Sequence, residues 1–185
     1  MAYITLSTAA ALTGLSKRTL WRRIADGQLH AKVSADQGEH TRVPLEEILP
    51  LSRLNLEADD HALIRLADMG EAEAQCDLAL LFLTQKQPGE AVHWLTLSAK
   101  QHYPEALHQL GRCYIAGNGV EADEAKGIEH IARAAALGHV TAKHMAAYLL
   151  DPTREALSPA ALESRLDMVE KHVVFGVLRE MAHPA

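Results

Sequence analysis

The sequence is poor in aromatic residues and contains no long hydrophobic run. Phe, Trp and Tyr make up 4% of the 185 residues, although hydrophobic residues together reach 48%. Because Ala and Leu dominate that share, we expect helices that pack closely through small side chains, and not an all-β fold. No segment approaches the roughly 20 apolar residues of a membrane span. The first residues also lack the basic-then-apolar order of a signal peptide. We therefore expect a cytoplasmic protein that does not contact a membrane.

Cysteine is scarce as well. Both cysteines, Cys76 and Cys113, fall inside apolar helical patterns. A small buried thiol is the common outcome in that setting, and a disulfide is unusual in a reducing compartment. We expect two buried, unlinked thiols.

Acidic residues outnumber basic ones, but not throughout the chain. The net charge is -6, yet residues 1–50 carry six Lys or Arg against five Asp or Glu and are therefore net +1. The remaining 135 residues hold 12 basic and 19 acidic residues and are net -7. A polyanionic partner is therefore expected to bind the first part only.

The basic residues of the first part gather around a predicted helix-turn-helix. Ser7 or Thr8 can cap a short helix that ends at Leu12, and Ser16 can cap a second helix that stops at Asp26-Gly27. In the second helix the apolar residues lie four apart and share one face, which must pack on the first helix. The basic side chains of the second helix then point away from this buried face or lie at its edges.

A hairpin is predicted to follow. Residues 29–33 and 40–43 have the pattern of short strands around a polar turn at 34–39. Pro44 then suits the first turn of another helix. The predicted order is helix, turn, helix, two-stranded wing, helix.

In this order the segment ITLSTAAALTGLSKRTLWRRIADGQLHAKV, with the later TRVPLEEIL, resembles the winged helix-turn-helix of the excisionase and MerR-like DNA-binding families. The resemblance implies that the second helix enters the major groove of double-stranded DNA and that the wing reaches nearby phosphates. Its most specific parts are the G-L-S-x-x-T-L turn and the D-G-x-L that follows. The DNA-binding residues expected on this basis are Ser16, Lys17, Arg18, Thr19, Trp21, Arg22, Arg23, Lys32 and Arg42.

Two features of this region leave alternatives open. Trp21 either covers the hairpin with a largely buried ring or contacts the sugar-phosphate backbone. The tip of the predicted wing carries Asp36 and Glu39, whereas the wing of the family is often basic. The acidic tip weakens the expectation of wing-to-phosphate contact.

The remaining 135 residues contain an internal repeat. Three segments, which begin at Gly70, His102 and Gly138, align with one another. Their alanines Ala74, Ala106 and Ala142 occupy the same position, and successive segments are 32 and then 36 residues apart. The segments AVHWLTLSAKQH and GIEHIARAAALG also align. Two helices per repeat, with small Ala at their crossing points and a Gly-rich loop between them, predict an α-solenoid.

The repeats resemble Sel1-like repeats, which are related to the tetratricopeptide class. The motifs are L-G-x-x-Y, G-x-G-V-x-x-D and A-A-x-x-G, and they are best preserved in the second repeat. The resemblance implies that this part binds another protein. A homodimer through the repeats or the last helix is expected on a separate ground, because a single winged motif covers only one half-site of DNA. The residues that fit are Gly111, Tyr114, Gly117, Gly119, Val120, Ala134, Ala135 and Gly138.

One long helix is predicted to end the chain, from Ser158-Pro159 to about Met181. Its apolar stripe either caps the open end of the solenoid or forms a self-association seam. The stripe consists of Leu162, Leu166, Val169, Val173, Val177 and Met181.

The predicted organisation is mainly α. A winged helix-turn-helix at 1–50 is followed by a linker at 51–58, Sel1-like repeats at 59–151 and a capping or dimerisation helix at 152–185. The helix at 59–69 is interpreted as the second half of a truncated earlier repeat.

Eleven histidines raise the question of a metal site, but their spacing predicts none. His139 and His144 are five apart and His102 and His108 six apart, so neither pair has the i, i+4 placement that brings two imidazoles to one helix face. No catalytic constellation can be argued from spacing either.

We therefore expect a protein without enzymatic activity, metal or cofactor. The leading hypothesis is a bacterial-type transcriptional regulator whose solenoid binds a protein or forms a homodimer. The alternatives are a non-enzymatic interaction scaffold and an excisionase-like architectural protein that bends DNA.

Overall fold

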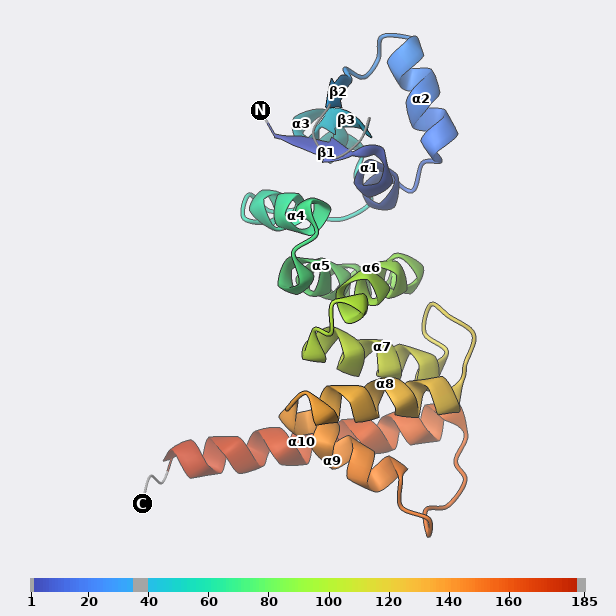
Figure 1. Cartoon of the computed structure of the whole chain (residues 1–185), viewed down its shortest axis with the longest axis vertical. Coiled ribbons are helices and arrows are strands. Elements are labelled where there is room, and N and C mark those ends of the chain that lie inside the picture. Colours follow the sequence, from blue (N-terminus) through green and yellow to red (C-terminus); the bar gives the residue numbers. More distant parts are fainter. Residues whose placement is uncertain (1, 35–39, 183–185) are drawn as a thin grey trace. The chain divides into compact units, whose positions relative to one another are not determined.

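A computed structural model describes residues 2–34 and 40–182 (Figure 1). The predicted turn of the wing, with Asp36 and Glu39, lies outside the described residues. The chain divides into two units, Met1–Lys86 and Gln87–Ala185.

Unit 1 contains a three-stranded antiparallel sheet. Strands β1 (Tyr3–Thr5), β2 (Lys32–Ser34) and β3 (His40–Pro44) lie in the order β1-β3-β2. The pairing of β2 with β3 confirms the two strands that were predicted for the hairpin. Strand β1 was not predicted, because three residues are too short to show the two-residue period of a strand. It pairs with β3 and places Ile4 opposite Val43, both fully buried.

Helices α1 (Leu6–Thr13) and α2 (Lys17–Ala25) follow β1, and α3 (Leu45–Ile48) with a 3-10 turn (Leu49–Leu51) follows β3. The predicted cap of the first helix was wrong. The extended Thr5 caps α1, and its side chain accepts a hydrogen bond from the Thr8 amide, because Ser7 and Thr8 are already helical. Ser16 caps α2 as predicted.

Two further helices, α4 (Asp60–Met69) and α5 (Ala72–Thr84), complete unit 1. Asp68 ties α4 to the elements before it. Its carboxylate accepts hydrogen bonds from the Thr5 amide at 3.0 Å and the Thr8 hydroxyl at 2.5 Å, and it pairs with Arg42 at 2.9 Å. These contacts join α4 to the strands within unit 1, and the division between the two units lies after α5, at Lys86 and Gln87.

Helices are the only regular secondary structure among the described residues of unit 2. Prolines occupy the first turn of α6, α7 and α10, where the missing amide proton costs nothing. The helices are α6 (Pro88–Lys100), α7 (Pro104–Ala116), α8 (Glu124–Ala136), α9 (Val140–Leu149) and α10 (Pro159–Ala182).

Helices α7 and α8 cross closely through two glycines. A Cβ on Gly111 would lie 2.6 Å from Ile131 Cγ1 and 2.8 Å from the Gly127 carbonyl oxygen. A Cβ on Gly127 would lie 2.8 Å from the Gly111 carbonyl oxygen in return. Alanine was predicted at the helix crossings, but glycine occupies both positions at this one.

Helix α10 packs on α7 and α9. Leu162, Leu166 and Val173 are buried, as expected of a helix that caps the stacked helices. Val169 is half-buried, and the side chains of Val177 and Met181 lie outside the described residues. A second set of apolar residues on this helix is exposed, namely Met168, Val174, Phe175 and Leu178.

Both cysteines are buried and unlinked, as predicted. Burial raises the pKa of the Cys113 thiol to about 11. Among the described residues, no helix is both long and apolar enough to span a bilayer.

Candidate functional site

The exposed side of α2 is the candidate surface predicted from the sequence. Leu20 is fully buried and anchors the helix, and Ile24 is half-buried beside it. Lys17, Arg18 and Arg22 are exposed. One helix therefore presents three cations to solvent.

These cations have no counterions within the described part of the chain. No ion pair is found there for Lys17, Arg18, Arg22 or Arg23, although Arg23 is half-buried. Arg22 and Arg23 also lie in the last turn of α2, where a cation interacts favourably with the helix dipole. The face carries net positive charge that is open to an anionic partner.

Polar and aromatic residues complete the surface. The Ser16 hydroxyl accepts a hydrogen bond from the Thr19 amide at 3.1 Å, so the start of α2 is held by its own side chains. Trp21 is 50% exposed, and the alternative of a largely buried ring over the hairpin was wrong. Lys32 is exposed on β2 and lies 5.9 Å from the centre of the Tyr3 ring.

Arg42 does not belong to this surface. The sequence placed it in the second strand of the wing as a phosphate contact, but its guanidinium pairs with Asp68, whose side chain is only 1% exposed. The reason is tertiary, because Asp68 on α4 reaches β3 from 26 residues away in the sequence. Arg42 therefore neutralises a buried carboxylate.

Unit 2 has a groove between α6, α7 and α8 with a cavity volume of about 370 Å³. Tyr114 and His130 stack within it, with ring centres 5.5 Å apart. Burial lowers the pKa of His130, which favours its neutral form. Lys100 and Arg133 also line the groove, and neither makes an ion pair among the described residues. The groove is thus aromatic with two available cations.

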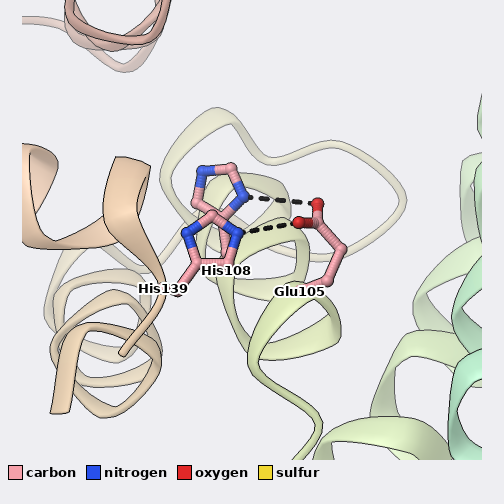
Figure 2. Close-up of side chains that lie close together, drawn as sticks. All are labelled: Glu105, His108 and His139. Atoms are coloured by element: carbon pink, nitrogen blue, oxygen red, sulfur yellow. Dashed lines mark hydrogen bonds and ion pairs between the residues drawn. The ribbon is translucent and has the colours of Figure 1, made fainter. Parts of the chain in front are cut away.

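A second cluster joins Glu105 and His108 of α7 to His139, which caps α9 (Figure 2). One oxygen of the Glu105 carboxylate lies 2.7 Å from His139 Nε2, and the other lies 3.5 Å from His108 Nδ1. The two imidazoles are close, with ring centres 4.5 Å apart. One carboxylate therefore faces two rings from different helices.

The hydrogen bonds of His139 set its tautomer. Its Nδ1 accepts from the Ala142 amide at 3.1 Å, so the ring proton lies on Nε2 and is donated to Glu105. Gln109 donates a further hydrogen bond to Glu105 Oε1 at 2.7 Å. The contact with His108, the bond from His139 and then that from Gln109 hold the pKa of the Glu105 carboxyl well below its usual value.

His108 is less well satisfied than its neighbours. The side chain is 1% exposed, and neither ring nitrogen has a hydrogen-bond partner among the described residues. Buried polar groups in proteins nearly always have partners, because an unpaired one costs free energy. His108 Nδ1 therefore has only the 3.5 Å contact with Glu105, and Nε2 has no partner among the described residues.

Spacing within single helices did not reveal this cluster, since it tested His108 against His102 and His139 against His144. The two histidines that meet are 31 positions apart, and they meet because successive repeats stack. The repeat register could have revealed the cluster. It brings the first helix of one repeat close to the capping residue of the next repeat. The expectation of no metal site rested on a test that could not detect this geometry.

Comparisons with known proteins bear on the repeat region. The family model of the Sel1 repeat matches residues 72–103 and 104–139. A solved structure, the crystal structure of a Sel1 repeat protein from Oxalobacter formigenes, is 25% identical in sequence. The alignment covers 63% of this chain and 98% of that chain, with a TM-score of 0.48. No curated protein matches the sequence. Residues 72–139 therefore form two Sel1 repeats, as the sequence motifs indicated.

Proposed function

We propose that the protein is a non-enzymatic adaptor whose Sel1 repeats bind a protein partner. The observation that carries the proposal is the match of two consecutive Sel1 repeats over residues 72–139. Stacked helix pairs present an extended surface, and repeat proteins use such surfaces for binding.

The groove of unit 2 indicates the chemistry of the partner. Lys100 and Arg133 flank the stacked pair of Tyr114 and His130 and lack counterions of their own in the described part of the chain. Tyr and Arg are enriched at protein interfaces because they combine apolar area with a polar group. A partner segment with an acidic side chain next to an apolar one fits this groove.

The test is a charge reversal in the groove. Arg133→Glu should weaken binding to a purified partner by about 5- to 150-fold, because loss of an interfacial cation costs about 1 to 3 kcal/mol. The matched control is Lys143→Glu, an exposed cation on α9 outside the groove. If both variants bind the partner like the wild type, the groove is not the binding surface.

We propose as a second function that α2 binds duplex DNA in the manner of a winged helix-turn-helix, which would make the adaptor a transcriptional regulator located in the cytoplasm. The specific support is the exposed face of α2 with Lys17, Arg18 and Arg22, which lacks counterions among the described residues. The order of α1, α2, β2 and β3 supports the same proposal. Lys32 on the outer strand is the flanking phosphate contact.

Salt-dependent binding tests this second function. Fluorescence anisotropy on random duplexes should show an affinity that falls with salt, and Arg22→Ala should reduce the salt slope by about 1. Arg179→Ala is the control, since it removes an exposed cation from α10. Absence of binding even at low salt would reject DNA recognition by α2 and leave the adaptor role standing.

A DNA-binding adaptor of this kind is expected to be a homodimer, because one winged motif covers only a half-site. The exposed apolar residues of α10, Met168, Phe175 and Leu178, support this proposal. Light scattering at micromolar concentration measures it directly. The bend angle of bound DNA separates a regulator from an excisionase-like architectural protein, which would bend its site.

A further inference from the structure

We propose that Glu105, His108 and His139 form a binding site for a divalent transition-metal ion, with zinc the best match. The inference is independent of the proposed partners of the protein. It rests on the geometry of the three side chains, on the lack of hydrogen-bond partners at the buried His108 ring within the described part of the chain and on access from solvent.

The geometry fits a single ion. One carboxylate oxygen of Glu105 and one nitrogen from each histidine lie within 4.8 Å of one another. Zinc holds such ligands at about 2.0 to 2.2 Å, which puts neighbouring ligand atoms in a tetrahedron about 3.3 Å apart. The two rings lie against different oxygens of the carboxylate, His139 Nε2 at 2.7 Å from Oε2 and His108 Nδ1 at 3.5 Å from Oε1. A small rotation of the carboxylate would accommodate the ion.

The burial of His108 and its lack of hydrogen-bond partners in the described part of the chain indicate that this side chain binds a metal ion and is not only part of a hydrogen-bonded cluster. Its side chain is almost completely buried, and both ring nitrogens lack hydrogen-bond partners among the described residues. A metal ion would satisfy one of them. His139 is 14% exposed and Glu105 35% exposed, so the ion can reach the site from solvent at the carboxylate.

The donor set selects the ion. Two imidazoles and one carboxylate suit zinc and its neighbours in the first transition series, whereas calcium and magnesium prefer oxygen ligands. Three protein ligands leave a fourth position for water. The hydrogen bond from Gln109 to Glu105 would orient the carboxylate, as is common around metal ligands.

Binding has one structural consequence that can be measured. Coordination through His139 Nε2 moves the ring proton to Nδ1, which then no longer accepts the hydrogen bond from the Ala142 amide. The lost cap at the start of α9 is a small penalty beside the free energy of a transition-metal site. Zinc should therefore shift the Ala142 amide resonance and change the tautomer of His139.

The site belongs to one repeat junction. In the register of the repeats, the positions of Glu105 and His108 are held by Glu73 and Cys76 in the preceding repeat, and that of His139 by Tyr103. Neither histidine has a counterpart there. The proposed ion would link α7 to the start of α9.

The experiment is a zinc titration of the full chain in competition with a chromophoric chelator. We expect one ion per chain and a midpoint of thermal unfolding that rises with zinc concentration. His139→Asn keeps a capping side chain but removes a ligand, and it should weaken zinc binding at least about 30-fold, since changes outside the ligand shell alone cost about 10- to 100-fold. Glu105→Gln should act in the same direction.

His93→Asn is the matched control, because it removes an exposed histidine of unit 2 outside the cluster, and it should leave zinc affinity unchanged. Equal zinc affinity in the wild type and in both site variants would overturn the proposal. So would the absence of zinc binding at micromolar concentration. If a variant fails to fold, the wild type provides the test. An Ala142 amide resonance that does not shift when zinc is added would also overturn the proposal.

Discussion

Cations are used in opposite ways on α2 and on α7. Lys17, Arg18 and Arg22 on α2 point into solvent without counterions among the described residues. Arg112 on α7 binds three acids of α10, namely Glu163, Asp167 and Glu170, the last at 2.7 Å. The comparison teaches that the positive charge of α2 is free for a partner, whereas that of α7 holds the fold together.

The largest expected effect comes from Asp68, the acid that fixes Arg42. Asp68→Ala removes the acceptor of two threonine contacts and leaves the Arg42 charge unpaired, so it should lower the free energy of unfolding of unit 1 by about 3 kcal/mol. Urea unfolding measures the change. Glu73→Ala, at an exposed position on α5, is the control and should shift the value by less than about 0.5 kcal/mol.

Breaking the Arg112 network should have the next largest effect. Arg112→Leu keeps much of the side-chain volume but leaves three carboxylates close together, and it should destabilise the packing of α10 by about 2 kcal/mol. Hydrogen exchange of α10 amides reports this locally. Faster exchange confined to α10 is expected, and unchanged exchange would show that burial of Leu162 and Leu166 alone holds the helix.

The contribution of Glu105 to stability should depend on pH. Its carboxyl pKa is lowered in the folded chain by contacts with His108 and His139. The stabilisation is therefore fully present above the usual pKa of 4.5 and is lost as the pH falls through the folded value. The difference in unfolding free energy between the wild type and Glu105→Gln should be constant near neutral pH and shrink below pH 4.5. A difference that grows on acidification would contradict the assignment.

The smallest effect on stability is expected on α2. Replacing Lys17, Arg18 and Arg22 together by Ala should change the free energy of unfolding by less than about 0.5 kcal/mol, because no described ion pair is lost. Thermal unfolding measures this directly. A large destabilisation would show that these cations support the fold, as Arg112 does, and are not free for a partner.

Much of the local structure could be predicted from the sequence because its causes are local. Ser16 caps α2, prolines begin α6, α7 and α10, and the 36-residue register identified the repeats. Strand β1 was not predicted, because three residues are too few to show the two-residue alternation of a strand. The pairing of Arg42 with Asp68 could not be predicted, because Asp68 lies on a helix that was expected to belong to another part of the chain.

The sequence by itself determined the helical repeats, the Ser16 cap and the concentration of positive charge on α2, since each depends on residues within a few positions of one another. Only the tertiary structure decided which charged groups are neutralised and which polar groups meet. Asp68 reaches Arg42 across unit 1, and His139 reaches Glu105 from the next repeat in unit 2. Contacts at a separation of 26 or 34 residues depend on how helices stack, and no local pattern encodes that.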